Sequence, residues 1–122
     1  MGADPQRPVL GPGPARLLVD GRDVAPVLVA DTPATRRKGL LGTSGVDGAL
    51  WITRCPSVHM MGMRYRIDIA VLDRAGVVLR TATLAPWWGM TWPRPRARAT
   101  VEMMPGSLRA WGIRPGALLA VS

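Results

Sequence analysis

The chain of 122 residues contains no phenylalanine, a single cysteine and no long apolar run. With Cys55 as its only thiol, it can form neither an intrachain disulfide nor a multi-cysteine zinc site. A membrane-spanning helix needs about 20 consecutive apolar residues, and so we expect no membrane span. Residues 1–14 hold no continuous apolar stretch, which excludes a secretory signal peptide and predicts a cytoplasmic protein.

Acidic residues are also scarce. The chain has 16 Lys and Arg against 8 Asp and Glu, which gives this basic protein a net charge of +8. Such a charge attracts polyanions, and so we expect weak, nonspecific polyanion binding. Hydrophobic residues make up 48% of the chain and charged residues 20%, a composition that supports a folded core and excludes global disorder. The length suits one domain.

The residue pattern divides the chain into a tail and a single domain. Residues 1–14 hold four Pro and three Gly without apolar periodicity, which predicts a flexible tail. Residues 15–122 contain short apolar runs separated by turn residues, which predicts a β-rich domain of about seven or eight short strands. The expected strands are 15–19, 24–30, 49–53, 57–61, 66–73, 77–84, 98–104 and 117–121. Pro26 indicates an edge position or a bulge in the second.

Two short helices complete the predicted fold. In residues 32–42, Thr32 can cap the helix, Pro33 suits its first position, and Gly42 is expected to end it. In residues 106–113, we expect Ser107 near the cap and Gly112 near the end. The predicted class is therefore mostly β (α+β), with a compact β-sandwich or a barrel-like arrangement.

Four segments of the chain match one family pattern. They read ADTPATRRKGLLG, GALWI, VHMMGMRYRIDIAVLDRAGVVL and VEMMPGSLRAWGIRPGALL. Together they resemble the prokaryotic family catalogued as domain of unknown function 192 (DUF192), in its variant V-H-x-x-G-M-R-x-x-I-D. The resemblance implies a compact β-rich fold and no particular reaction, because the family has no established activity. The chain departs from the pattern at Thr43, where Arg is common, and at Ala117, where Asp often follows Gly116.

The lone cysteine and the lone histidine lie four residues apart. In an extended chain, Cys55, His59 and Met63 would share one face. This arrangement of a thiol, an imidazole and a thioether on one face can be interpreted in three ways. They can be structural, with the sulfur atoms filling gaps in the core. They can form a soft-metal site that suits Cu(I). They can form a nucleophile and its base.

Two acidic residues stand in apolar strands. Asp68 has Ala70 and Leu72 on its own face, which predicts partial burial and an obligatory partner. His59 or the Gly62–Arg64 segment are the candidate partners, and Asp68 is either a structural latch or a ligand-facing acid. Glu102, the only glutamate, either faces outward or joins Asp68 across the sheet.

Residues 86–98 interleave tryptophan and arginine in a long loop that includes Trp88 and Trp92. Stacking bases on tryptophan while arginine pairs with phosphate is a way of binding single strands. The same side chains suit a cap over an open end of the β core, or a protein interface.

These observations favour a non-catalytic accessory module without a cofactor, which binds an unknown protein or small-molecule ligand. Its candidate pocket comprises His59, Met63, Arg64, Asp68, Glu102, Trp88 and Trp92. The first alternative is a small enzyme or copper-handling protein that uses Cys55, His59 and Asp68. The second is nonspecific nucleic-acid binding through the tryptophan- and arginine-rich loop.

Overall fold

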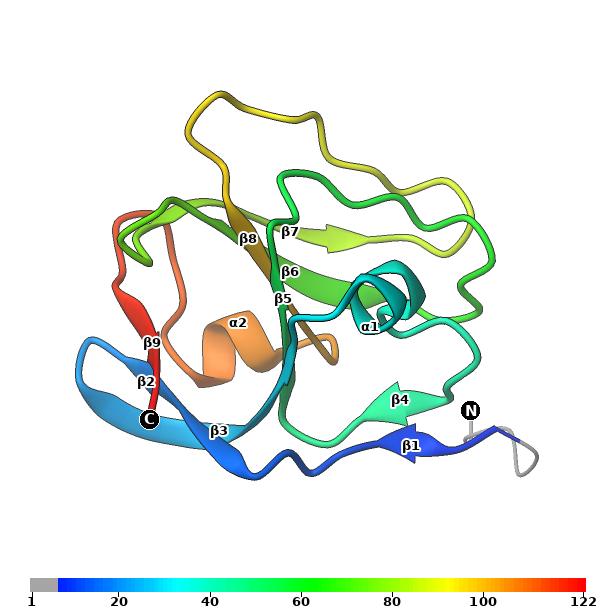
Figure 1. Cartoon of the computed structure of the whole chain (residues 1–122), viewed down its shortest axis with the longest axis horizontal. Helices are drawn as coiled ribbons and strands as arrows, with labels where there is room; N and C mark the ends of the chain where they lie inside the picture. The colour runs from blue at the N-terminus through cyan, green and yellow to red at the C-terminus, as the bar shows by residue number, and fades with distance from the viewer. Residues whose placement is uncertain (1–6) are drawn as a thin grey trace.

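The computed structural model describes residues 7–122. Within this range the chain forms nine strands and two short helices (Figure 1). In chain order they are β1 (Val9–Leu10), β2 (Ala15–Val19), β3 (Arg22–Ala30), α1 (Pro33–Lys38), β4 (Gly45–Val46), β5 (Ala49–Thr53), β6 (Ile67–Leu72), β7 (Val78–Leu84), β8 (Ala99–Met103), α2 (Ser107–Ala110) and β9 (Leu119–Val121). No helix in the described range is long and apolar enough to cross a membrane.

Seven strands form one curled sheet in the order β7-β6-β8-β5-β3-β2-β9. All neighbouring pairs are antiparallel except β3 and β5. The two edges of the sheet approach each other, since Val77 and Leu118 form an isolated bridge and the N–H of Val78 donates to the carbonyl of Ala117 at 2.8 Å. The mostly β prediction is confirmed, in its barrel-like form.

Both faces of the sheet are buried, which the alternation in β6 shows. Ala70 and Leu72 face an inner core enclosed by the curl, and Ile67, Ile69 and Val71 face an outer core. Leu108 and Trp111 pack against the inner core from α2 and the residue after it. The outer core is covered by the loops between β5 and β6 and between β7 and β8, through side chains such as Met60 and Ala97. Polar groups on the outer face are therefore held under these loops.

Two local predictions for the strands are wrong. Residues 57–61 do not form a strand. Within this segment only His59 forms a β-bridge, with Met90. The other backbone hydrogen bonds, to the loop between β7 and β8, do not continue as a ladder. Pro26 does not lie at an edge, since β3 pairs with both β2 and β5. The predicted bulge in this strand is present, because Leu17 pairs with Ala25 and Leu18 with Asp23, which leaves Val24 of β3 as the extra residue. The β5 pairing begins only at Val27. Pro26 therefore precedes the ladder in which its missing N–H would be needed.

Helix α1 begins as predicted and ends earlier. The side chain of Thr32 accepts from the N–H of Thr35, with Pro33 in the first turn. The helix ends at Lys38 because Gly39, at φ 50°, takes a conformation that favours glycine and donates its N–H to Thr35. The predicted end at Gly42 is therefore wrong.

Strand β1 lies within the predicted tail. It pairs in parallel with β4, and the carbonyl of Leu10 accepts the N–H of Asp47 at 2.8 Å. Leu10 also packs against the outer core. The first part of the predicted tail, residues 1–6, lies outside the described residues.

Candidate functional site

Glu102 is a buried acid on the outer face of the sheet. It stands in β8 between Val101 and Met103, which both face the inner core, so the alternation turns its side chain outward. Its neighbours in register are Leu50 and Ile69, which belong to the outer core. Glu102 is only 5% exposed, and so the prediction that it faces outward into solvent is wrong.

The carboxyl group of Glu102 has no hydrogen bond or ion pair with any described residue. Burial alone raises its pKa from 4.5 to about 7. This is the effect expected when a carboxylate leaves water and gains no partner. The carboxyl oxygens are not fully enclosed, and so a hydrogen-bond donor can still reach them from outside the protein.

The group faces a small pocket between the sheet, α1 and the loop after β5. A Cβ atom added to Gly39 at the end of α1 would lie 3.3 Å from Oε1 of Glu102. The pocket has a volume of about 110 Å³, which suits a small molecule. Apolar side chains line part of it, and three basic residues of α1 line another part. The lining residues are Arg36, Arg37, Lys38, Gly39, Leu40, Leu41, Ile52, Cys55, Ser57, Val58, His59, Met61, Met63 and Glu102.

Three of the sequence-predicted residues therefore meet Glu102 in this pocket. Cys55, His59 and Met63 all line it, although the chain between them is a loop and not the expected strand. Met63 is buried in the outer core, whereas His59 is exposed. Sequence reasoning missed the contribution of α1. The signal was present in the basic residues at the end of a predicted helix.

Cys55 is a protonated thiol. Its Sγ donates to the carbonyl of Ser57 at 3.2 Å, and burial raises the pKa of the thiol above its ordinary value. A nucleophile or a copper ligand requires the thiolate. Across residues 7–122, moreover, no group of three or more His, Cys, Asp and Glu side chains is placed to hold a metal ion.

Asp68 does not belong to the pocket. It faces the inner side of β6, where it is 2% exposed, and its Oδ1 accepts from the hydroxyl of Thr83 at 2.6 Å. Its Oδ2 accepts the N–H groups of Gly106 and Leu108 at 2.9 and 3.2 Å. Asp68 is therefore a latch that holds the start of α2 against the sheet. The expected partners near His59 and Gly62–Arg64 are wrong.

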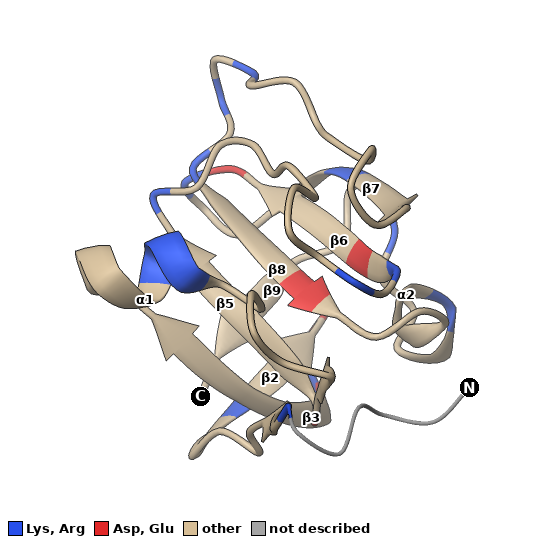
Figure 2. Cartoon of the chain, turned by 90° about the vertical axis from the view of Figure 1, so that its right-hand side faces the viewer, with Lys and Arg blue, Asp and Glu red and all other residues tan. Residues whose placement is uncertain are grey.

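The two acids lie on opposite faces of the sheet. In the register of β6 and β8, Asp68 stands beside Met103 and Glu102 stands beside Ile69. Neighbouring residues along a strand point to opposite faces. The prediction that Glu102 joins Asp68 is therefore wrong, and Figure 2 shows the two acidic positions on separate strands.

The remaining candidates lie outside the pocket lining. Arg64 is exposed, and Trp88 and Trp92 are 89% and 71% exposed on the loop between β7 and β8. The loop nevertheless supports the pocket wall, because the N–H of Met60 donates to the carbonyl of Gly89.

A hydroxyl pair joins two segments next to the pocket. Thr43 and Tyr65 themselves lie outside the pocket lining, and their bond ties the turn after α1 to the loop after β5. The hydroxyl of Thr43, in the turn after α1, donates to the carbonyl of Leu40 at 2.7 Å. The hydroxyl of Tyr65, in the loop after β5, therefore donates to Thr43, also at 2.7 Å. Burial raises the pKa of Tyr65, which keeps this donor protonated. Thr43, where the family resemblance places an Arg, is thus a structural residue.

The fold is similar to that of two solved structures. One is a protein of unknown function from Novosphingobium aromaticivorans DSM 12444, with a TM-score of 0.72 and 22% identity over 86% of this chain and 83% of that chain. The other is described as a "putative transcription regulator" from Sinorhizobium meliloti 1021, with a TM-score of 0.72 and 19% identity over 88% of this chain and 91% of that chain. At such identity the likeness shows the fold alone.

No curated protein matches the chain. A family model does match it, over residues 16–121, which is nearly all of the predicted domain. The family is designated DUF192 and described as "Uncharacterized ACR", words that name no activity. The segments that carried the resemblance, including those that supply Gly39 and Glu102, lie within the match. The chain therefore belongs to the DUF192 family.

Proposed function

We propose that this domain is a non-catalytic binding module whose small-molecule ligand enters the pocket beneath α1 and donates a hydrogen bond to Glu102. The observation that carries the proposal is the buried carboxyl of Glu102, which faces the pocket and has no partner among residues 7–122. A ligand that supplies the missing donor offsets the cost of burying this group.

The charges around the pocket define the ligand further. A cationic group such as an ammonium suits the carboxyl at the bottom, because an opposite charge restores its ionised form. Arg36, Arg37 and Lys38 line another side and suit an anionic group. The volume of about 110 Å³ admits only a small molecule. These features fit a small zwitterion, such as an amino acid, with its ammonium toward Glu102 and its carboxylate toward α1.

The enzyme alternative has less support from the same residues. It requires Cys55, His59 and Asp68 to act together. Asp68 lies on the other face of the sheet with its own partners, and the thiol of Cys55 is protonated. A binding role needs neither group to react.

Calorimetric titration tests the proposal with three probes: γ-aminobutyrate, butyrate and butylamine. We expect the zwitterion to bind more tightly than either single-charge probe. Glu102→Gln should weaken its binding about tenfold or more, the effect of losing a charge-assisted hydrogen bond. Asp47→Asn is the matched control, because Asp47 is exposed, lies outside the pocket lining and carries the same charge. The proposal would be refuted if the Glu102→Gln protein bound γ-aminobutyrate as tightly as the wild type, or if Asp47→Asn weakened the binding as much as Glu102→Gln.

A further inference from the structure

A second hollow lies on the inner side of the sheet, away from Glu102. It is an open groove with a volume of about 710 Å³. The ends of β3, β5 and β9, the start of β8 and the turn between β6 and β7 surround it. This volume is within the range of about 300–1,000 Å³ found for ligand sites. Trp51 lines this groove and Ile52 lines the pocket beneath α1. Because these two neighbours point to opposite faces of β5, the groove and the pocket are separate sites.

Three arginines line the groove. They are Arg54 after β5, Arg74 in the turn after β6, and Arg98 before β8. Arg54 and Arg74 have no hydrogen-bond or ion-pair partner in the described part of the chain. Asp73 is the one acidic residue in the lining. The groove thus carries an excess of positive charge that the protein itself does not neutralise.

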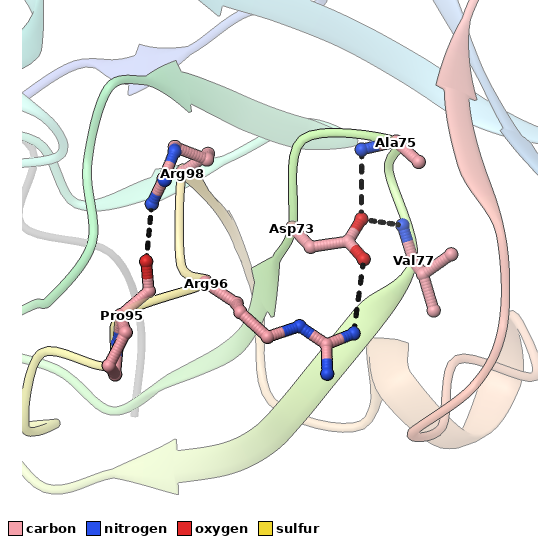
Figure 3. A network of polar contacts seen from close by, with 6 residues as sticks. All are labelled: Asp73, Ala75, Val77, Pro95, Arg96 and Arg98. Atoms are coloured by element: carbon pink, nitrogen blue, oxygen red, sulfur yellow. Dashed lines mark hydrogen bonds and ion pairs between the residues drawn. The ribbon is translucent and has the colours of Figure 1, made fainter.

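Asp73, the acidic residue of the lining, binds backbone groups of its own turn (Figure 3). Oδ1 of Asp73 accepts the N–H groups of Ala75 and Val77, both at 2.9 Å. Its Oδ2 lies 3.9 Å from a guanidinium nitrogen of Arg96, which is itself outside the groove lining. Asp73 therefore shapes the turn that presents Arg74, and its charge is already shared with Arg96.

The position of Arg98 is also fixed by the fold. Its Nη1 donates to the carbonyl of Pro95 at 2.7 Å (Figure 3). The same nitrogen also donates to the carbonyl of Ala97 at 2.9 Å. These bonds hold the guanidinium at the rim before any ligand arrives. A guanidinium held in place loses little conformational entropy when it binds an anion.

The floor of the groove is apolar and aromatic. Trp51 is half-buried and lines it together with Val29 and Ala99, where the inner core reaches the surface. An aromatic side chain beside several arginines is the combination that accepts a base and its phosphate. A bare phosphate would use the arginines and leave the aromatic floor uncovered.

We propose that this groove binds a nucleotide, with its phosphate held by the three arginines and its base against Trp51. The same chemistry is offered by a free nucleotide and by a nucleotide within a single strand. This site differs from the exposed tryptophans of the loop between β7 and β8, and it is independent of the function proposed for the pocket beneath α1.

Calorimetric titrations with adenosine monophosphate, adenosine, inorganic phosphate and a short oligodeoxyadenylate test the assignment at constant ionic strength. We expect adenosine monophosphate to bind more tightly than adenosine or phosphate. Arg74→Gln should weaken that binding about tenfold, since it removes a charge-assisted hydrogen bond. Arg114→Gln is the matched control, because Arg114 is exposed, lies outside the groove and carries the same charge. If the oligonucleotide binds more tightly than adenosine monophosphate, the ligand of the groove is a nucleotide within a single strand. If the two bind equally, the ligand is the free nucleotide.

A second pair of variants tests the base. Trp51→Leu should bring the affinities for adenosine monophosphate and phosphate close together, whereas Trp88→Leu should leave their ratio unchanged. The fold of each variant is checked by circular dichroism. Three results would overturn the proposal: no binding of adenosine monophosphate, equal binding of phosphate, or an equal loss in the Arg114→Gln control.

Discussion

Replacing Asp68 with alanine removes the acceptor that anchors α2 to the sheet. The wild-type carboxylate accepts the N–H groups of Gly106 and Leu108 at 2.9 and 3.2 Å and the hydroxyl of Thr83 at 2.6 Å. All three donors would lose this bond, and the side chain they surround is 2% exposed. Water can compensate only part of this loss, because Thr83 and Gly106 are exposed whereas the side chain of residue 68 is not.

The size of the effect follows from these contacts. A hydrogen bond to a charged acceptor is worth about 1.5–3 kcal/mol. Losing three of them, partly offset because a carboxylate no longer has to be buried, predicts a loss of about 3–5 kcal/mol. For a domain of this size, where 1 kcal/mol shifts the melting temperature by about 4 °C, it should fall by about 12–20 °C. Thr83→Ala removes one donor and should cost about 1 kcal/mol.

Urea unfolding, followed by circular dichroism, measures these losses. In a double-mutant cycle, Asp68→Ala and Thr83→Ala should be non-additive, because the two side chains share a bond. Asp68→Ala and His59→Ala should be additive, because the carboxylate of Asp68 is held by Thr83, Gly106 and Leu108 and not by the imidazole. A melting temperature within a few degrees of the wild type, or a coupling with His59, would refute the latch.

Three further outcomes are expected. Because burial raises the pKa of Glu102 from its ordinary value of 4.5 to about 7, the folded protein binds more protons than the unfolded chain between these values, and its stability should fall as the pH rises through them. Glu102→Gln should remove this dependence and stabilise the protein at alkaline pH by about 3 kcal/mol in urea unfolding; an unchanged profile would contradict it. Deleting residues 1–10 should cost about 1–3 kcal/mol, because the outer core loses the packing of Leu10 and the N–H groups of Ser44 and Asp47 lose their carbonyl acceptors; an unchanged melting temperature would argue against a structural role for β1. Cys55 should react with iodoacetamide more slowly at neutral pH than a cysteine in a peptide, because burial raises its pKa; an equal rate would show an exposed thiol.

Local chemistry made part of the fold predictable. The cap formed by Thr32 and Pro33 depends on neighbouring residues, and the structure has it as expected. The alternation of Ile67, Asp68 and Ile69 also assigned each side chain to its correct face, since that pattern depends only on the pleat. The segment around His59 resembles a strand in its residue types, but its apolar residues pack onto the outer core from a loop and do not pair in a ladder.

The pocket beneath α1 was predictable only in part, because His59, Met63 and Glu102 line it, whereas the other candidates and the residues of α1 required the fold. Glu102 is flanked by apolar residues on both sides, so only the register of β8 decides which face it occupies. The partners of Asp68 at Gly106 and Leu108 are 38 and 40 residues away. They are backbone N–H groups, which almost every residue type has, so the sequence does not indicate them. The basic residues of α1 line the same pocket as Glu102 only because the fold brings the end of α1, at Gly39, close to Glu102.

The pKa of Glu102 tests the account most directly, and the chain is well suited to its measurement. Glu102 is the only glutamate, so labelling glutamate with ¹³C at the carboxyl carbon gives one carboxylate signal to follow by NMR as the pH is changed. A buried carboxyl without a partner should titrate with a midpoint of about 7. A midpoint at or below the ordinary value of 4.5 would mean that the group is solvated or paired within the protein, and it would contradict the proposed ligand site.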